Sequence, residues 1–297
     1  MTVKFSGEIG KSFGGFSGPV ISLPTKGNTP PRDLEAFSYY IYGQHKIGKT
    51  SFTTMFNKGF HLFYEPGGKD YGGIFSREPK NWVEFLGYVK LLEDAQAEGE
   101  LEFKTTIIDP VDLCYWDCLI HTCKTMHGSD YPPTTDFGKT WNKIGTNFRE
   151  AIYRLAKISG VVFVSHAKEV TITKHDDSTY DMIRPTAANK CHEILSKFCD
   201  LTGYFHMDKN NTRIMRIIPD MHMEAGNRFE NHFRYKGTDK PIVQIDMGTS
   251  KKDAYNNFLL GFNNEVLEPR NEDPKSQKSS EEKKETALPS PIKIKRI

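Results

Sequence analysis

The chain has 297 residues, of which 37% are hydrophobic and 26% charged, and its 40 basic and 38 acidic side chains give a net charge of +2. A mean hydropathy of −0.56 and the lack of any apolar run of ~18 residues argue against a membrane-spanning protein, and residues 1–18 lack the apolar block of a secretory signal. We therefore expect a cytoplasmic protein with no membrane partner. A uniformly basic coat for nucleic acid is excluded too, so any such contact must come from a local patch.

Composition divides the chain into three parts. Residues 1–34 are rich in Gly, Ser, Phe and Pro without helix or strand periodicity, which predicts an arm that lies across its own domain or on a neighbouring subunit. Residues 35–267 predict one folded domain. Residues 268–297 are dense in Pro, Ser and mixed charge, which predicts a disordered tail. Its basic end, 292–297, is either simply solvated or a short peptide that pairs with the sheet edge of a protein partner or with phosphates.

Short apolar runs alternate with amphipathic stretches inside the predicted domain. Buried strands are predicted at residues 37–42, 60–64, 105–108 and 161–164, because each run is β-branched or aromatic and is bounded by Gly, Pro or charge. Apolar spacings of three and four predict two helices, with faces made of Trp82, Phe85, Val89 and Leu92 and of Trp141, Ile144, Phe148, Ile152 and Leu155. Strands alternating with helices predict an α/β fold, with a mainly parallel twisted sheet flanked by helices.

The character of the chain changes after Cys199. Apolar runs at residues 201–206 and 214–218 flank a turn-rich stretch, which predicts an antiparallel hairpin at the edge of the sheet. Residues 242–245 predict one more strand.

The five cysteines are an odd number and favour reduced thiols. They are Cys114, Cys118, Cys123, Cys191 and Cys199. The first three, with the nearby His121 and His127, are a conceivable metal cluster, but the CxxC spacing of structural zinc sites is absent. Small buried cysteines on a helix are the simpler interpretation.

The strongest motif is a complete GxxxxGK[ST] sequence, placed between the first predicted strand and a helix expected at residues 51–56. With the serine that follows, it consists of Gly43, Gln44, His45, Lys46, Ile47, Gly48, Lys49, Thr50 and Ser51. The glycines let successive backbone N–H groups face phosphates. Lys49 is expected to reach the β- and γ-phosphates, and Thr50 to offer its hydroxyl to Mg²⁺. This P-loop predicts ATP and Mg²⁺ as cofactors, bound at a helix N-terminus.

Two carboxylates follow predicted strands. Asp109 closes the run at 105–108 and is expected to hold Mg²⁺ through water, although Asp before Pro110 is also an ordinary turn. Glu65 follows the run at 60–64, a strand expected to lie next to the P-loop strand. There it would orient the attacking water, the alternative being a capped surface turn.

Polar residues also follow the fourth predicted strand. Ser165 and His166 are placed to sense the γ-phosphate, unless His166 is merely a satisfied strand-end histidine. Residues 167–190 form a long polar stretch with balanced charge, which predicts a functional or disordered loop. Residues 128–140 predict another loop, either a plain connection or a contact with DNA.

The ordered set of P-loop, Glu65, Asp109 and Ser165-His166, with Asp136 to Trp141 and Gly226 to Phe229, resembles the phage-encoded RecA-like ATPases of single-strand annealing and recombination. The resemblance covers residues 36–235. It implies a RecA-like core, with Glu65 as the catalytic glutamate, Lys49 and Thr50 as phosphate and Mg²⁺ ligands, and Ser165-His166 as a switch to a DNA-facing loop. It also implies the host cytoplasm as the location and a homo-oligomeric ring or filament.

In such an oligomer a cation from the neighbouring subunit would assist catalysis. The candidates are Arg213, Arg216, Arg228 and Lys236. The sequence around Arg228 gives it a slight preference.

Two functions follow. The first is an ATP-hydrolysing protein that acts on single-stranded DNA through residues 128–140 and 167–190. The alternative is a nucleotide-switched protein-binding module with little hydrolysis, which acts through the arm and the tail. A small-molecule kinase fits less well, because no Arg-rich lid is evident.

Overall fold

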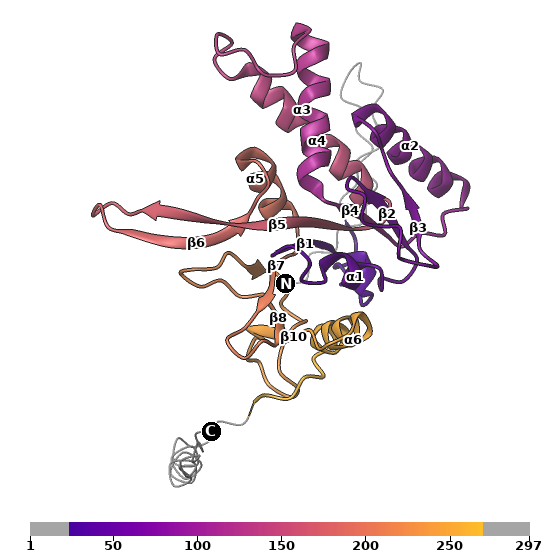
Figure 1. Ribbon diagram of the computed structural model, residues 1–297. Coiled ribbons are helices and arrows are strands. Elements are labelled where there is room, and N and C mark those ends of the chain that lie inside the picture. The colour runs from indigo at the N-terminus through magenta and orange to yellow at the C-terminus, as the bar shows by residue number, and fades with distance from the viewer. Residues whose placement is uncertain (1–23, 270–297) are drawn as a thin grey trace, which may run out of the picture.

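The computed structural model describes residues 24–269. Most of the predicted arm at 1–34 and nearly all of the predicted tail at 268–297 lie outside these residues. The described part is built on one twisted sheet with helices on both faces (Figure 1). No helix within it is both long enough and apolar enough to cross a membrane.

The sheet has ten strands. Six adjacent strands, in the order β7-β1-β5-β4-β2-β3, run parallel to one another. These strands are β1 (Ser38–Gly43), β2 (Gly59–Phe63), β3 (Phe75–Arg77), β4 (Thr105–Asp109), β5 (Gly160–Thr173) and β7 (Leu201–Met207). Antiparallel strands complete the sheet, namely β6 (Thr179–Pro185), β8 (Arg213–Arg216), β9 (Gly226–Asn227) and β10 (Gln244–Asp246). All four predicted buried strands are present, and so is the predicted edge hairpin, β7–β8.

The strand order corrects one expectation. The strand that carries Glu65 does not lie next to the P-loop strand, because β5 and β4 stand between β1 and β2. The carboxyl ends of all four strands nevertheless open at one edge of the sheet, since the four strands are parallel.

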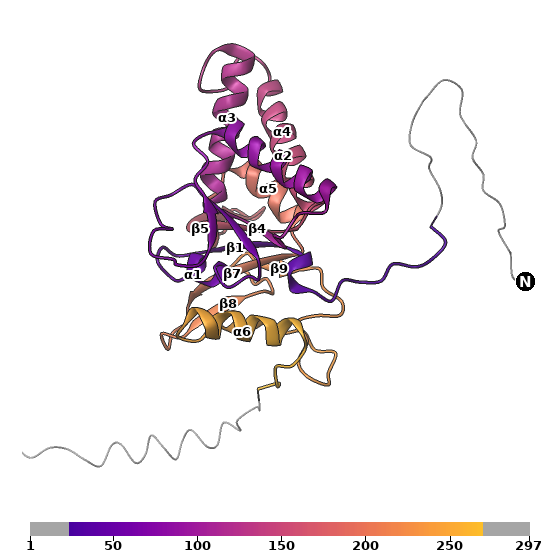
Figure 2. The ribbon, with the colours of Figure 1, turned by 90° about the vertical axis from the view of Figure 1, so that its right-hand side faces the viewer.

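Helices cover both faces of the sheet, as Figure 2 shows from the side. They are α1 (Lys49–Thr53), α2 (Trp82–Glu98), α3 (Val111–His127), α4 (Lys139–Ala156), α5 (Asn189–Phe198) and α6 (Lys251–Phe262), with a 3₁₀ turn, η1, at Leu34–Ala36. Helices α2 to α5 pack on one face, against side chains such as Tyr40 and Phe163. Helices α1 and α6 pack on the other, against Ile41 and Val162. Side chains that alternate along each strand thus fill two separate cores.

The two predicted helix faces are confirmed except at one residue. Trp82, Phe85, Val89 and Leu92 are the buried residues of α2. In α4 the buried face includes Ile144, Phe148, Ile152 and Leu155, but Trp141 is 45% exposed. The buried position one turn before Ile144 is Thr140, whose hydroxyl bonds His127 Nε2 at 2.6 Å.

The stretch at 167–190 is a hairpin and a helix, not a loop. Strand β5 runs on past the sheet and pairs with β6, and the two project from the body of the molecule (Figure 1). Val170 pairs with Met182 and Ile172 with Tyr180, so the alternation of apolar and polar residues that defines a strand was present in the sequence. The balanced charges concealed it.

The five cysteines lie in the interior of the described part of the chain. All five are free and buried. In the part of the chain that the structure describes, no three His, Cys, Asp or Glu side chains come together as metal ligands would.

Candidate active site

The P-loop leaves the carboxyl end of β1 between two other strands. Gly43 is in register with His166 on β5 and with Phe205 on β7. A Cβ on Gly43 would lie 2.0 Å from the carbonyl oxygen of Phe205, so this position admits only glycine because a neighbouring backbone occupies the space.

The loop then curls through backbone angles that few residues adopt. Gly48 has φ +107° and Lys46 has φ 60°. Within residues 24–269, no backbone N–H from His45 to Gly48 donates a hydrogen bond to another protein group. These donors are therefore free for an anion, as a phosphate-binding loop requires.

Lys49 is nearly buried at the start of α1, with 5% of its surface exposed. Its Nζ donates to the carbonyl oxygens of Gly43 at 2.8 Å and Gln44 at 2.7 Å. Burial lowers the pKa of Lys49 to about 8, and the nearby carboxylates Asp109, Asp112 and Glu65 oppose that shift. The ammonium thus lies across the mouth of the loop, where it can meet phosphate oxygens.

Thr50 and Asp109 are joined directly. The Thr50 hydroxyl donates to Asp109 Oδ2 at 2.6 Å. Burial raises the pKa of Asp109 to about 6, while the Thr50 hydroxyl and Lys49 favour the ionised form. A hydroxyl and a carboxylate at this distance, beside free loop amides, fit the hard oxygen ligands and bound waters of Mg²⁺.

Glu65 and His166 face each other across the same edge. Glu65 Oε1 lies 3.6 Å from His166 Nε2, and the Glu65 side chain is 51% exposed. The His166 ring stacks on His45 of the P-loop, with centroids 3.9 Å apart. Burial and the nearby Lys49 lower the pKa of His166, which favours the neutral ring. Glu65 is thus in reach of water, and His166 bridges it to the loop.

Ser165 is buried and belongs to a polar network behind the site. Its Oγ lies 3.3 Å from Oγ1 of Thr186, which donates to Asp112 Oδ1 at 2.6 Å. The backbone N–H of Thr186 donates to the carbonyl oxygen of His166 at 2.9 Å. Asp112 Oδ2 is buried and, among the described residues, has no partner. Sequence reasoning missed Asp112 and Thr186, since neither belongs to a motif.

Arg228 is not part of this edge. It follows β9, which pairs with the amino end of β7, and its guanidinium donates to the carbonyl oxygen of Lys197. The fold therefore brings all the other predicted site residues to one edge of the sheet, namely Gly43 to Ser51, Glu65, Asp109, Ser165 and His166. Arg228 lies at the opposite edge.

The buried carboxyl of Asp109 should lower stability at neutral pH. Its pKa is about 6 in the fold against 3.8 for the free side chain, so the folded state binds the proton more tightly. The free energy of unfolding therefore falls as the pH rises from about 4 to about 6, and this group causes no further loss above that range. Asp109→Asn should raise the melting temperature of the nucleotide-free protein by a few degrees at pH 7.5 and by nothing at pH 4, while turnover is lost. Equal melting temperatures of the two proteins at pH 7.5 would contradict this.

The comparisons with known proteins agree with the geometry. The sequence profile described as an AAA domain matches residues 35–229, a range that holds the P-loop, both carboxylates and Ser165-His166. Comparison with the curated proteins finds no match. The mostly parallel mixed sheet flanked by helices, with this P-loop at its carboxyl edge, is that of an α/β P-loop NTPase. Since the profile spans well over half of the chain, the protein belongs to the AAA domain family and carries a P-loop ATPase-type domain.

Proposed function

We propose that this protein binds ATP with Mg²⁺ and hydrolyses it, as an ATPase of RecA-like type. The observation that carries the proposal is the convergence of Lys49, the bonded pair of Thr50 and Asp109, and Glu65 at one edge of the sheet. Free loop amides, a buried ammonium and a buried carboxylate suit a triphosphate and a divalent cation, and little else explains burying them together.

Each residue has a role in this proposal. Lys49 exchanges the two loop carbonyls for phosphate oxygens and balances the charge that develops in transfer. Thr50 would hold Mg²⁺ through its hydroxyl, and Asp109 would hold it through a bound water. Glu65, half exposed, orients the attacking water and accepts its proton, while His166 lies between Glu65 and His45 of the loop.

Lys49→Ala should abolish nucleotide binding and turnover, whereas Glu65→Gln should retain binding and lose at least ~10²-fold in kcat, because Gln cannot take the proton. Equilibrium binding and phosphate release measure the two effects separately. Turnover unchanged in either variant would refute the assignment of that residue. ATP binding with no turnover in the wild-type protein would favour the nucleotide-switched binding module instead.

We propose single-stranded DNA as the partner, and the groove between α4 and α5 as its contact surface. The loop at 128–140 and the β5–β6 hairpin are less suited to DNA, because in each of them the acidic side chains outnumber Lys and Arg by one. The groove has a volume of about 410 Å³, and its lining includes three cations, Arg149, Lys190 and Lys197, against one acid, Glu193.

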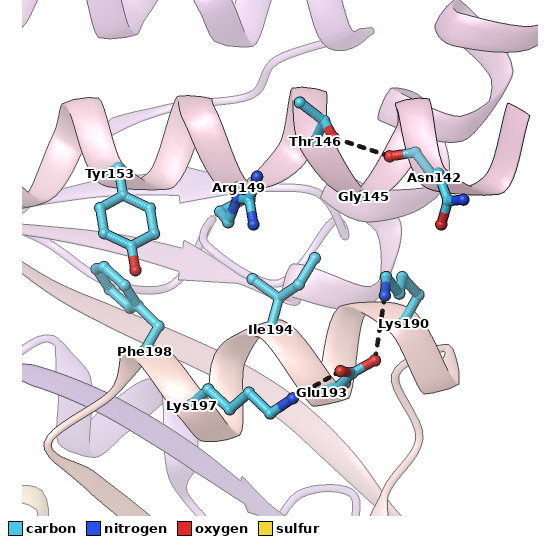
Figure 3. A pocket seen from close by; sticks show the side chains of 10 residues that line it. All are labelled: Asn142, Gly145, Thr146, Arg149, Tyr153, Lys190, Glu193, Ile194, Lys197 and Phe198. Atoms are coloured by element: carbon cyan, nitrogen blue, oxygen red, sulfur yellow. Dashed lines mark hydrogen bonds and ion pairs between the residues drawn. The ribbon is translucent and has the colours of Figure 1, made fainter. Parts of the chain in front are cut away.

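Side chains in the groove support this choice (Figure 3). Glu193 accepts hydrogen bonds from Lys190 at 3.2 Å and from Lys197 at 2.7 Å. Of the three cations that line the groove, Arg149 is therefore the one that has no ion pair with the described residues. Tyr153 is 50% exposed and stacks edge-on against Phe198 at 5.1 Å. A free guanidinium beside an exposed aromatic ring suits a phosphate and an unstacked base.

The groove is also connected to the nucleotide site. Helix α5 begins three residues after Thr186, which bonds Asp112 and the backbone of His166. A shift of His166 on ATP binding would thus pull on the start of α5, which gives a route for coupling hydrolysis to DNA.

Arg149→Ala should weaken binding of a single-stranded oligonucleotide and lower the slope of log K against log salt by ~0.7, the value for one phosphate contact. Lys143→Ala is the matched control, since Lys143 lies on the same helix outside the groove and is exposed. Fluorescence anisotropy at several salt concentrations gives both quantities. Equal slopes for the two variants would rule out the groove, and no binding by the wild-type protein would rule out the DNA partner.

We propose finally that the protein works as a ring or filament in which Arg228 approaches the nucleotide of a neighbouring subunit. Its position at the edge of the sheet opposite the P-loop suits a contact in trans and no contact in cis. Arg228→Ala should lower kcat ~10³-fold with unchanged nucleotide affinity. Mixing it with the Lys49→Ala variant should restore part of the activity, and a mixture without activity would argue against the role in trans.

A further inference from the structure

A second cation reaches the P-loop from the edge hairpin. Arg213 opens β8, directly after the turn that follows β7, and β7 ends at the same edge as the P-loop. A Cβ on Gly48 would lie 3.0 Å from Arg213 Nη1, so the guanidinium stands directly against the loop of its own chain.

One nitrogen of the Arg213 guanidinium has a hydrogen-bond partner and another, which is buried, has none. Arg213 Nε donates to the carbonyl oxygen of Gly248 at 2.8 Å, which fixes the plane of the group. Arg213 Nη2 is buried and has no hydrogen-bond partner within residues 24–269. None of the ion pairs in that range includes Arg213, whereas Arg216 on the same strand pairs with Asp220 at 3.2 Å.

An unpaired buried guanidinium N–H is costly, and an anion is the partner that would satisfy it. The loop that the guanidinium stands against also carries the backbone amides from His45 to Gly48, which donate to no other backbone group within residues 24–269. One phosphate group placed there would accept from both.

The side from which Arg213 approaches identifies the phosphate. Asp109, Glu65 and His166 belong to β4, β2 and β5, all on one side of β1, and in the proposed function they hold the γ end of the triphosphate. Arg213 comes from β8, beyond β7 on the other side of β1. A chain of phosphates whose γ end lies on the first side can extend along the loop to the second side, where its α end would meet Arg213.

We infer that Arg213 binds the α-phosphate of the nucleotide in cis, as a contact that ATP and ADP share. The inference rests on the proposed function, because it needs a nucleotide in the P-loop. It separates Arg213 from the cation expected from a neighbour, since a residue that contacts the α-phosphate contributes to binding rather than to the transfer of the γ-phosphoryl group.

Arg213→Ala in the full chain should weaken ADP and ATP by the same factor, about 10- to 100-fold, which is the usual range for one charge-assisted hydrogen bond in a buried site. The kcat at saturating ATP should change by less than ~3-fold, because uniform binding affects KM alone. Titration calorimetry with ADP and with a non-hydrolysable ATP analogue measures affinity independently of turnover.

Two further variants separate binding from folding. Arg213→Lys keeps the charge but loses the fork and should recover part of the affinity. Lys209→Ala removes one exposed cation from the same hairpin and should leave both affinities unchanged. The melting temperature without nucleotide reports whether Arg213→Ala is folded, and if it is not, the comparison of Arg213→Lys with the wild-type protein decides.

Three results would overturn the inference while leaving the ATPase in place. They are unchanged affinity for both nucleotides, loss of affinity for the ATP analogue alone, and loss of kcat with unchanged affinity, which would move Arg213 to the γ end or to a neighbour's site. A wild-type protein that binds neither nucleotide would refute the proposed function itself, and this measurement comes first.

Discussion

The active site depends on burying one ammonium among carboxylates at the end of a sheet. Lys49 is 5% exposed and Asp109 is 8% exposed, and each group makes burial of the other tolerable. Neither charge is neutralised by a direct ion pair. The Lys49 ammonium donates to two neutral loop carbonyls, and the Asp109 carboxylate accepts a hydrogen bond from one hydroxyl. Burying these two charged groups lowers the stability of the fold. Such a cluster is typical of a site where charged ligands complete it, here a phosphate for Lys49 and a cation for Asp109.

The edge of the sheet that carries the P-loop is also where the β5–β6 hairpin and the groove between α4 and α5 join the site. His166 is the last point where β5 lies in the sheet beside β1, and the chain beyond it is the projecting hairpin. Thr186 returns the hairpin to the site and leads into α5. Hairpin, groove and P-loop therefore meet at a few polar contacts, which is the physical basis for relating nucleotide state to partner binding in the proposed function.

Local signals predicted much of the fold correctly. The four buried strands and the β7–β8 hairpin follow from short apolar runs, and the faces of α2 and α4 follow from apolar spacings of three and four. Both signals depend only on near neighbours in the chain. Trp141 was wrongly predicted to be buried. It lies in the first turn of α4, where the helix extends beyond the core, so its spacing from Ile144 does not indicate burial. The β5–β6 hairpin was missed since its charges resemble those of a loop. The expectation that β2 adjoins β1 was wrong because strand order depends on packing between distant elements.

For the site, the sequence by itself determined the P-loop and the residues that end the strands at Glu65, Asp109 and Ser165-His166. The structure brings these residues together, because parallel strands end at one edge of the sheet and the loop leaves β1 at that same edge. Only the tertiary structure decided that Asp112 and Thr186 close a network behind His166, that Arg213 faces Gly48, and that Arg228 lies at the far edge. Those contacts join residues that are distant in the chain, and side-chain pairing of that kind depends on how the strands are ordered rather than on any local pattern.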